Sequence, residues 1–472
     1  MQHTRVRFAP SPTGHLHIGG FRSALFNYLF ARHHNGSYLL RIEDTDLERS
    51  KQIYQDSILA AFNWAGMMPD EPVEIQSQYI DEHKSLINRL LDEGKAYRCY
   101  CTQEEVAVRY QKAHATTDLF VKYDGACRII KEILDKPCAV RFALPADLKE
   151  ISFKDLIRGE VVIGIDQLDD FIIARSDGTP MYNFVVVVDD MRMRITHVIR
   201  GEEHIINTPK QILLYHALGH SAPHFAHIPL ILGKDGSKLS KRDAATSIVE
   251  YIEAGYLPDA FINYFARLGW SHGDQEIFSR EELVQHFTLE QIGKKGAIFD
   301  QEKLDWVNSI YLRRMKSFAL FEYIERWIDR DFRQKVGHWH VERVYQLIDL
   351  YKERVKTVKE LAHVVLAAIT GPDEFTASDL LTYFAGDVPT HIEDLIEMLE
   401  QIALFEVDLM KETIKRFCTE HRLGLAVVAQ PVRIALVGTV SSPGIFDLLA
   451  IFGKEESLLR LRRLIKDAAK SR

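Results

Sequence analysis

Residues 7–46 constrain the fold of this 472-residue chain more than any other segment. Residues 6–9 are short and apolar, which is typical of a buried strand, and prolines and a glycine at 10–14 then interrupt regular structure. Apolar residues recur at helical spacing over 22–30, and residues 38–42 predict a second strand. A strand, a helix and a strand in this order predict an α/β fold with a parallel sheet.

The start of the predicted helix is suited to binding phosphate. Its unpaired N–H groups and the positive end of its dipole attract anions, and Gly19 and Gly20 let a ligand approach the backbone closely. His15 and His17 precede the helix and point the same way on an extended segment. Three carboxylates at 43–46 follow the second strand, where ligands bind in parallel sheets. We therefore predict a phosphate site with an acidic site beside it.

Two motifs in this segment resemble those of a known enzyme family. The run FAPSPTGHLHIGG at 8–20 resembles the ATP-binding signature of class I aminoacyl-tRNA synthetases, in the form carried by the glutamyl and glutaminyl enzymes. The family's four-residue signature falls on residues 17–20, and RIEDTD at 41–46 resembles the same subgroup. The order and spacing of the two motifs match the family.

A lysine-rich loop at 233–247 carries the second signature. A positive and mobile loop can close over a triphosphate as charge develops, although loops of this composition are also common as solvated surface. Within it, KLSKR at 238–242 resembles the second class I signature in its glutamyl-type variant. Two signatures in register identify the family more specifically than either does alone.

The resemblance implies an α/β fold in which a Rossmann-like parallel-sheet catalytic domain with a connective insertion precedes an all-α anticodon-binding region. Helical periodicity throughout the C-terminal part is similar to bacterial-type glutamyl enzymes, whereas eukaryotic glutaminyl enzymes have β-barrels there. The expected divisions are the first catalytic half at 1–94, the insertion that contacts the RNA acceptor end at 95–180, the second catalytic half with the KLSKR loop at 181–245, a helical stem-contact region at 246–317, and the anticodon-binding region at 318–472.

Residues 172–188 predict a β-hairpin. Asp177 and Gly178 form a turn signal between two apolar runs. The second run, FVVVVDD at 184–190, predicts a buried strand closed by two aspartates.

Three of the five cysteines suggest a metal site, because a chain of this length with so few cysteines has no disulfide framework. Thiolates of Cys99, Cys101 and Cys127 could share a zinc ion, which normally has four ligands. The glutamyl family often has zinc here, with its fourth ligand at the position of Ile129, and isoleucine cannot ligate. His114 and Cys138 lack the family's spacing. The site is therefore either a zinc site with an unassigned ligand or a remnant with reduced thiols.

The overall charge and hydropathy limit the partners and the location that we expect for the protein. The net charge of −8 means that RNA, if bound, contacts local basic patches. The sequence has no apolar run of about 18 residues, so we expect no membrane contact. The N-terminus has no apolar signal core, and we expect a cytoplasmic protein. We also expect a monomer.

The resemblance implies activation of L-glutamate with ATP and Mg²⁺, followed by transfer to tRNA. A substrate with a side-chain carboxylate calls for arginine, which binds carboxylates bidentately. One further family position, an asparagine in some members, is Val186 here, so that contact is not expected. The implied residues are Arg7, Ser11, Glu43, Tyr182 and Arg200 for glutamate; His17, Gly19, Gly20, Glu203, Lys238 and Lys241 for ATP; and His15, His17, Lys238 and Lys241 for catalysis.

Several alternatives differ from glutamate transfer to the glutamate tRNA. A glutamyl enzyme that also or only charges the glutamine tRNA has the same signatures, and so does a glutaminyl enzyme. A catalytically silent RNA-binding paralogue would have no reason to keep His17, Lys238 and Lys241. Adenylating relatives without RNA substrates do not need the helical C-terminal part.

Overall fold

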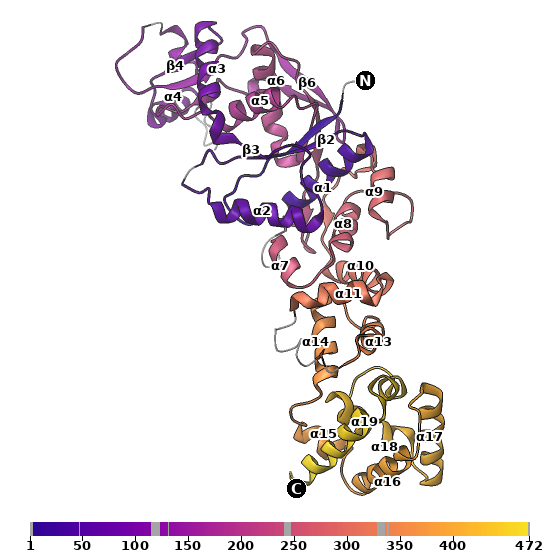
Figure 1. The fold of residues 1–472 in the computed structure, drawn as a ribbon. Helices are drawn as coiled ribbons and strands as arrows, with labels where there is room; N and C mark the ends of the chain where they lie inside the picture. Colours follow the sequence, from indigo (N-terminus) through magenta and orange to yellow (C-terminus); the bar gives the residue numbers. More distant parts are fainter. Residues whose placement is uncertain are drawn as a thin grey trace. The chain divides into compact units, whose positions relative to one another are not determined.

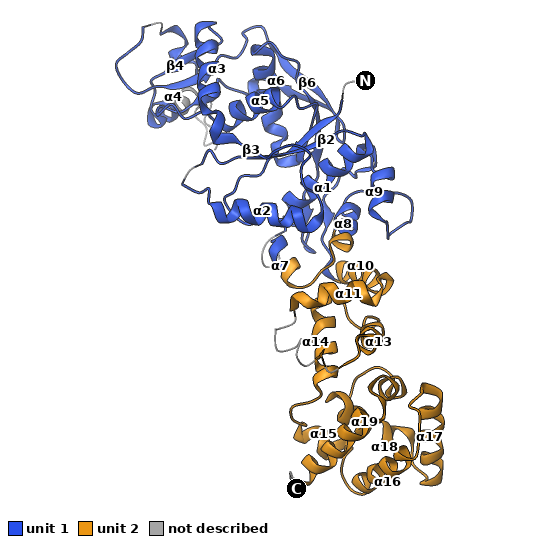
Figure 2. Ribbon diagram, viewed as in Figure 1, with its two compact units in different colours: residues 1–250, 262–301 blue, residues 251–261, 302–472 orange. Residues whose placement is uncertain are grey.

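The computed structural model describes residues 3–46, 48–114, 123–130, 132–239, 247–327, 336–337 and 339–470. The chain divides into two compact units, Met1–Glu250 with Ile262–Gln301 and Tyr251–Phe261 with Glu302–Arg472 (Figure 2). All the strands in the described residues belong to the first unit, and the regular elements described in the second unit are helical. The five divisions predicted from the sequence stay predictions.

A seven-stranded sheet lies at the centre of the first unit (Figure 1). Its strand order is β3-β2-β1-β9-β10-β6-β7, and every pair is parallel except β6 with β7. The parallel sheet predicted from the sequence is therefore confirmed. The strands are β1 (Arg5–Phe8), β2 (Ser37–Ile42), β3 (Glu74–Ile75), β6 (Glu150–Asp155), β7 (Gly159–Gly164), β9 (His197–Gly201) and β10 (His224–Ile228).

Helix α1 (Ile18–His33) connects β1 to β2, as predicted, and is buried along most of its length. Val6 on β1 pairs with Tyr38 on β2 in parallel register. The chain enters β2 through Gly36, where a Cβ atom would lie only 2.4 Å from the backbone oxygen of Thr4. Glycine at this position lets the two strands start side by side, and the start of α1 then lies at their carboxyl ends.

Residues 182–192 form helix α5 (Tyr182–Arg192), so the predicted strand at 184–190 is wrong. The predicted hairpin is limited to the turn, where Ala174 forms an antiparallel bridge with Pro180. Residues 176–179 do form a turn, in which Gly178 has a φ of +81°. The apolar run that follows is buried from Phe184 to Asp190. A helix buried on all sides has no amphipathic period, and a run of valines then resembles a strand.

A second, three-stranded antiparallel sheet contains β4 (Ala96–Cys99), β5 (Ala139–Phe142) and β8 (Ile172–Ala174). Helix α4 (Gln103–His114) and the 3₁₀ helix η2 (Ala126–Ile129) lie between β4 and β5 in the chain. The remaining elements associated with the first unit are α2 (Gln52–Ala65), α3 (Ile80–Asp92), α6 (Thr208–Ala217), α9 (Arg280–His286) and the pair β11 (Ile231–Leu232) and β12 (Ala297–Ile298), while α7 (Ile248–Glu253) and α8 (Pro258–Arg267) are divided between the two units.

The described part of the second unit confirms the predicted helical region. Its last helix, α19, bends at Gly453, whose φ of +74° is outside the helical range. None of the helices in the described ranges is long and apolar enough to cross a membrane. The helices are α10 (Gln301–Arg314), α11 (Ser317–Ile324), α13 (Val341–Tyr351), α14 (Val358–Thr370), α15 (Ala377–Tyr383), α16 (Val388–Glu400), α17 (Val407–Glu420), α18 (Leu425–Val437) and α19 (Ile445–Lys470).

Candidate active site

A pocket of about 210 Å³ lies at the carboxyl ends of β1, β2 and β9, beside the start of α1. This is the edge at which parallel sheets bind ligands. The pocket brings together seven residues that the sequence analysis assigned to glutamate or ATP: Arg7, Gly19, Gly20, Glu43, Tyr182, Arg200 and Glu203. Phe8, Ala9, Ser23, Val186, Ile199, Gly201 and His204 complete its lining.

A buried network of ion pairs lies behind one wall of the pocket. Arg7 donates from Nε and Nη2 to Asp190, at 3.0 and 3.1 Å, and Arg41 donates to the same carboxylate at 2.6 Å. Arg41 also donates to Glu43 at 3.0 Å. Burial alone would raise the pKa of Asp190, but the two guanidinium groups outweigh it and lower that pKa. Asp190 therefore stays ionised and holds both arginines in place.

At Glu43, in contrast to Asp190, the effect of burial on the pKa outweighs that of the neighbouring arginines. Burial raises the pKa of Glu43, and the neighbouring Arg41 only partly opposes the shift. A cationic group of a ligand at this wall would favour the ionised form of Glu43, because charges of opposite sign attract strongly where water is excluded.

Arg200 is held by neutral partners instead of a carboxylate. Its Nε donates to Nε2 of His227 at 3.2 Å, and its Nη2 donates to the hydroxyl of Thr208 at 2.8 Å. Its Nη1 is buried and has no hydrogen-bond partner among the described residues. Burial lowers the pKa of Arg200, although an arginine remains protonated at neutral pH. The pocket thus contains a buried cation with an unused donor.

Two uncharged side chains of the pocket lining, those of Tyr182 and His204, lie close together. The hydroxyl of Tyr182 lies 3.3 Å from Nδ1 of His204. Burial, followed by the nearby charge of Arg200, lowers the pKa of His204 to about 4. His204 is therefore neutral at pH 7 and can accept or donate a hydrogen bond there.

His17 caps the N-terminus of α1. Its Nδ1 accepts a hydrogen bond from the backbone N–H of Gly19 at 3.1 Å. A neutral imidazole that accepts at Nδ1 carries its proton on Nε2, which makes Nε2 a donor. His15 lies elsewhere on the same exposed segment, with Nδ1 2.9 Å from the hydroxyl of Ser57. Among the described residues, neither histidine lines the pocket, and neither does Ser11.

The two signatures approach each other through the chain around the lysine-rich loop. The loop leaves β11 through a tight turn, in which Lys238 forms a bridge with Leu232. It returns at Ser247, which forms an antiparallel bridge with His17. Residues 240–246 lie outside the described residues, and Lys241 is one of them. The described ends of the loop thus connect the second signature to the first.

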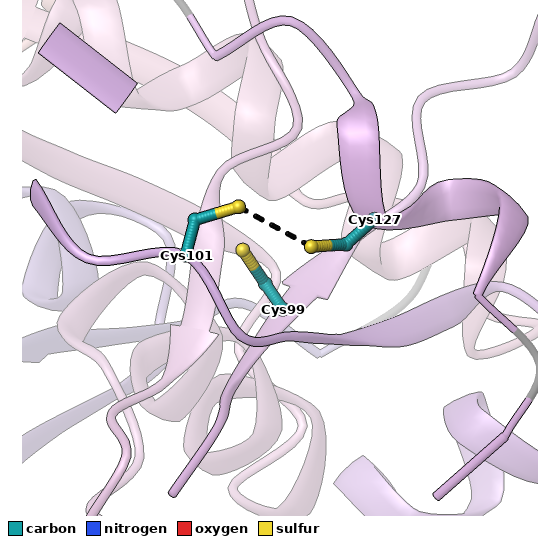
Figure 3. Close-up of side chains that lie close together, drawn as sticks. All are labelled: Cys99, Cys101 and Cys127. Atoms are coloured by element: carbon teal, nitrogen blue, oxygen red, sulfur yellow. Dashed lines mark hydrogen bonds between the residues drawn. The ribbon is translucent and has the colours of Figure 1, made fainter. Parts of the chain in front are cut away.

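Cys99, Cys101 and Cys127 lie close together, although they come from the end of β4 and from η2 (Figure 3). Their sulfur atoms are all within 4.8 Å of one another. Ile129, at the family's fourth position, is 86% exposed and offers no donor atom. The hydroxyl of Tyr123 lies 3.5 Å from the sulfur of Cys99 and 3.9 Å from that of Cys101. The same oxygen accepts a hydrogen bond from the backbone N–H of Cys127 at 2.8 Å.

Two arginines surround these thiols. Arg109 donates to the sulfur of Cys101 at 3.1 Å, and Arg141 donates to that of Cys99 at 3.2 Å. Several thiolates around one Zn²⁺ exceed its charge, and adjacent guanidinium groups offset the excess. The donors and charges therefore fit zinc. Cys138 does not belong to the cluster in the described part of the chain.

Comparison of the sequence with models of protein families identifies the family of this chain. A model of the catalytic domain of class I tRNA synthetases (E and Q) matches residues 3–306, and a model of an anticodon-binding domain matches residues 319–465. The chain belongs to the class I tRNA synthetases. The signatures at 17–20 and 238–242 lie within the range matched by the family's catalytic domain.

Relatives that match the chain over nearly their full length are glutamate–tRNA ligases within this family. The chain is 47% identical to a glutamate–tRNA ligase of Thermodesulfovibrio yellowstonii over 98% of its length and 99% of the relative. It is 43% identical to that of Geobacter sulfurreducens, with the same coverage. A crystal structure of a glutamate tRNA ligase from Elizabethkingia meningosepticum in complex with its amino acid has a TM-score of 0.86 at 34% identity, covering 98% of this chain and 99% of that one.

Several residues in and around the pocket of this synthetase were not assigned a role from the sequence. Asp190 was recognised only as part of a presumed strand end, and Arg41 only as part of a motif. His204 directly follows Glu203 in a run of polar residues at a strand end, and this position could have indicated that it belongs to the site. His227 and Asp155 lie on neighbouring strands far apart in sequence, so no local pattern links them. The catalytic and binding roles of the predicted residues stay predictions.

Proposed function

We propose that the chain activates L-glutamate with ATP and transfers the glutamyl group to the 3′-terminal ribose of the glutamate tRNA, as a glutamate–tRNA ligase. The observation that carries this proposal is the pocket with two buried arginines, Arg7 and Arg200, in a chain that matches glutamate–tRNA ligases over their full length. ATP, glutamate and tRNA are the substrates of this class of enzyme.

The amino acid would bind through charge complementarity. Nη1 of Arg200 is buried without a partner in the described chain, and Asp190 engages Arg7 only through Nε and Nη2. Two guanidinium groups suit the side-chain carboxylate of glutamate, whereas glutamine would leave the charge of Arg200 unmatched. Glu43 would accept a hydrogen bond from the substrate ammonium group.

The activation step needs no general base in this proposal. The α-carboxylate of glutamate has a pKa far below 7, so it attacks the α-phosphorus of ATP already ionised. A bond forms between the carboxylate oxygen and that phosphorus, and the bond to the bridging oxygen breaks, which releases pyrophosphate. The protein therefore contributes alignment and charge stabilisation.

The phosphates would bind at the start of α1. His17 would donate from Nε2 to a phosphate oxygen, and the N–H groups at the helix start would add to its attraction. Gly19 and Gly20 keep this wall open, and Glu203 lies on the same pocket. Lys238 and Lys241 would stabilise the pyrophosphate as it leaves. Mg²⁺ accompanying ATP would shield the phosphate charge.

Zinc would bind at the thiol cluster away from this chemistry. Cys99, Cys101 and Cys127 would hold it, with the phenol oxygen of Tyr123 in the place that Ile129 cannot fill. A zinc ion there supplies structure, because it ties the end of β4 to η2. The other possibility is a metal-free cluster of reduced thiols.

Further assignments rest on the sequence. The helical second unit would contact the tRNA through the region that matches the anticodon-binding model, residues 319–465. A monomeric state and a cytoplasmic location stay predictions.

A charging assay tests the proposal directly. Purified protein is incubated with ATP and labelled glutamate or glutamine, and with the glutamate and glutamine tRNAs separately. We expect glutamate on the glutamate tRNA. Glutamate on both tRNAs would identify an enzyme of relaxed specificity, and glutamate on the glutamine tRNA alone would redirect its tRNA assignment.

Two other results would overturn the proposal. Charging with glutamine would show that the two arginines do not select a carboxylate. An absence of charging with either amino acid, in a preparation that binds tRNA, would favour a silent RNA-binding paralogue. A Lys238→Ala variant serves as the matched negative control.

A further inference from the structure

A second group of metal-ligating side chains lies in the helical unit, independent of the thiol cluster. His391 and Asp394 are on α16, and His421 is the residue at the end of α17. One ligand atom of each lies within 4.8 Å of the ligand atoms of the other two. Residues three apart on a helix share a face, so α16 presents His391 and Asp394 together.

The chemistry of the three side chains is that of a transition-metal site. Two imidazoles and one carboxylate are typical ligands of Zn²⁺, with bonds of about 2.0–2.2 Å. Nδ1 of His421 and Oδ2 of Asp394 are 3.9 Å apart. Ligands of a tetrahedral zinc ion are about 3.3 Å apart. Small side-chain rotations would therefore bring this pair onto one ion.

His391 supplies a separate observation. Its Nδ1 is buried and has no hydrogen-bond partner in the described part of the chain. A buried polar atom without a partner is destabilising, and it is uncommon in native structures. A metal ion bound at Nδ1 would supply this atom with a partner and would fix the tautomer of the ring.

The neighbouring aromatic rings restrict the positions of the two histidines. The ring of His421 stacks on Phe417 at a centroid distance of 4.2 Å. The rings of His391 and His421 are 5.7 Å apart and nearly perpendicular, at 76°. Stacking limits the rotation of His421, so less freedom is lost when it coordinates an ion.

An ion pair alone explains the cluster poorly. The separation of 3.9 Å between His421 and Asp394 is too long for a hydrogen bond, and the Asp394 side chain is 45% exposed. Exposed pairs of this kind contribute little to stability. An ion pair also leaves His391 without a role.

We propose that His391, Asp394 and His421 bind one Zn²⁺ ion that links α16 to the end of α17. Three protein ligands leave the fourth position for water. The proposal does not depend on the assigned enzyme activity, because these residues belong to a different unit from the glutamate pocket.

Zinc binding to the full-length chain tests the proposal. The three thiols are first replaced, as Cys99→Ser, Cys101→Ser and Cys127→Ser, so that the thiol cluster cannot contribute. Equilibrium dialysis with Zn²⁺ alone should give one bound equivalent for this parent protein. His391→Ala and His421→Ala, each made in the parent, should lose it. His363→Ala is the matched control, because His363 is exposed on α14 outside the cluster.

Each outcome of this experiment either supports or overturns the proposed zinc site. Loss of the equivalent in both cluster variants, with retention in His363→Ala, supports the site. No bound zinc in the parent, or equal binding by parent and cluster variants, overturns it. A similar loss in His363→Ala would show weak binding to surface histidines and would also overturn it.

A spectroscopic measurement covers the case in which the serine variants fold poorly. Co²⁺ is bound to the unmodified chain, where thiolate ligands give a sulfur-to-cobalt charge-transfer band and imidazole ligands do not. In His391→Ala and His421→Ala the total cobalt bound should fall by one equivalent while the charge-transfer band keeps its intensity. An unchanged cobalt content would contradict the proposal.

Discussion

His227 donates a hydrogen bond from Nδ1 to Asp155 at a distance of 2.6 Å, and both side chains are buried. This contact places the imidazole proton on Nδ1, so Nε2 can accept from Nε of Arg200 at 3.2 Å. Asp155 therefore orients Arg200 through His227. Burial lowers the pKa of His227 despite the adjacent carboxylate, which keeps the ring neutral in this role.

Replacement of Asp155 by asparagine should misorient Arg200. Oδ1 of Asp155 accepts from the backbone N–H groups of Ile157 and Arg158, at 2.9 and 2.8 Å. An asparagine would keep its oxygen there and turn its NH₂ group toward Nδ1 of His227, which would move the imidazole proton to Nε2. That proton would face the N–H of Arg200. We expect the KM for glutamate to rise at least about tenfold in ATP–pyrophosphate exchange, because a hydrogen bond to a charged group contributes about 1.5–3 kcal/mol.

The KM for ATP separates this effect from general damage. It should change little in Asp155→Asn, since the phosphates are assigned to the start of α1. Asp147→Asn, at an exposed position, is the matched control and should leave both constants unchanged. Equal increases in the KM for glutamate and for ATP would refute a positioning role.

Arg7→Ala should weaken glutamate binding more strongly than Asp155→Asn does. The change removes a cation from the pocket wall and leaves Asp190 with Arg41 as its remaining buried partner. We expect the half-saturating glutamate concentration to rise about 100-fold, since a charged hydrogen bond and its desolvated partner contribute about 3 kcal/mol together. An unchanged half-saturating concentration would remove Arg7 from the site.

The buried aspartate should make stability depend on acid pH. The pKa of Asp190 is lowered in the folded protein, whereas an unfolded aspartate titrates near 3.9. The unfolded chain therefore binds the proton first, and the stabilising contribution is present above about pH 4 and lost as the pH falls further. Urea unfolding between pH 3 and 7 should show this loss. Asp190→Asn should lower stability by about 3–5 kcal/mol at pH 7 and reduce the acid dependence.

The first strand, helix and strand could be predicted because their determinants are local. Apolar spacing defines α1, and Gly36 gives the chain room to enter β2. The residues assigned to glutamate were predicted from motifs that match a family, and the pocket contains four of them, Arg7, Glu43, Tyr182 and Arg200. Local patterns and motifs thus selected several residues that the fold brings together in one pocket.

Contacts between distant segments could not be predicted in the same way. Helix α5 was mistaken for a strand because burial on all sides removes the periodicity that distinguishes the two. The pair of Asp155 and His227 depends on β6 and β10 being neighbours in the sheet. Tyr123 lies 24 residues after Cys99 in the sequence, so no local pattern links its hydroxyl to the thiols.

Tyr123→Phe should weaken metal binding at the thiol cluster. The change removes the phenol oxygen but keeps the ring that lies beside Arg141. We expect at least about a tenfold loss of affinity, because even outer-shell partners of a metal contribute about 10–100-fold. The sulfur-to-cobalt charge-transfer band measures binding at this cluster alone. Tyr100→Phe is the control, since the Tyr100 hydroxyl instead accepts from the backbone of Leu134. Equal affinities in the two variants would exclude Tyr123 as a ligand.

Lys241→Ala should separate catalysis from binding. Lysine in the second signature is assigned to the leaving pyrophosphate, where negative charge develops only as the bond breaks. We expect the rate of activation to fall about 100-fold, as for loss of one charge-stabilising donor, with the KM for glutamate nearly unchanged. Lys234→Ala, in the same loop but outside KLSKR, is the matched control. Because the end of this loop pairs with His17, a general disturbance of the loop would affect both variants, and similar losses in the two would refute a specific role for Lys241.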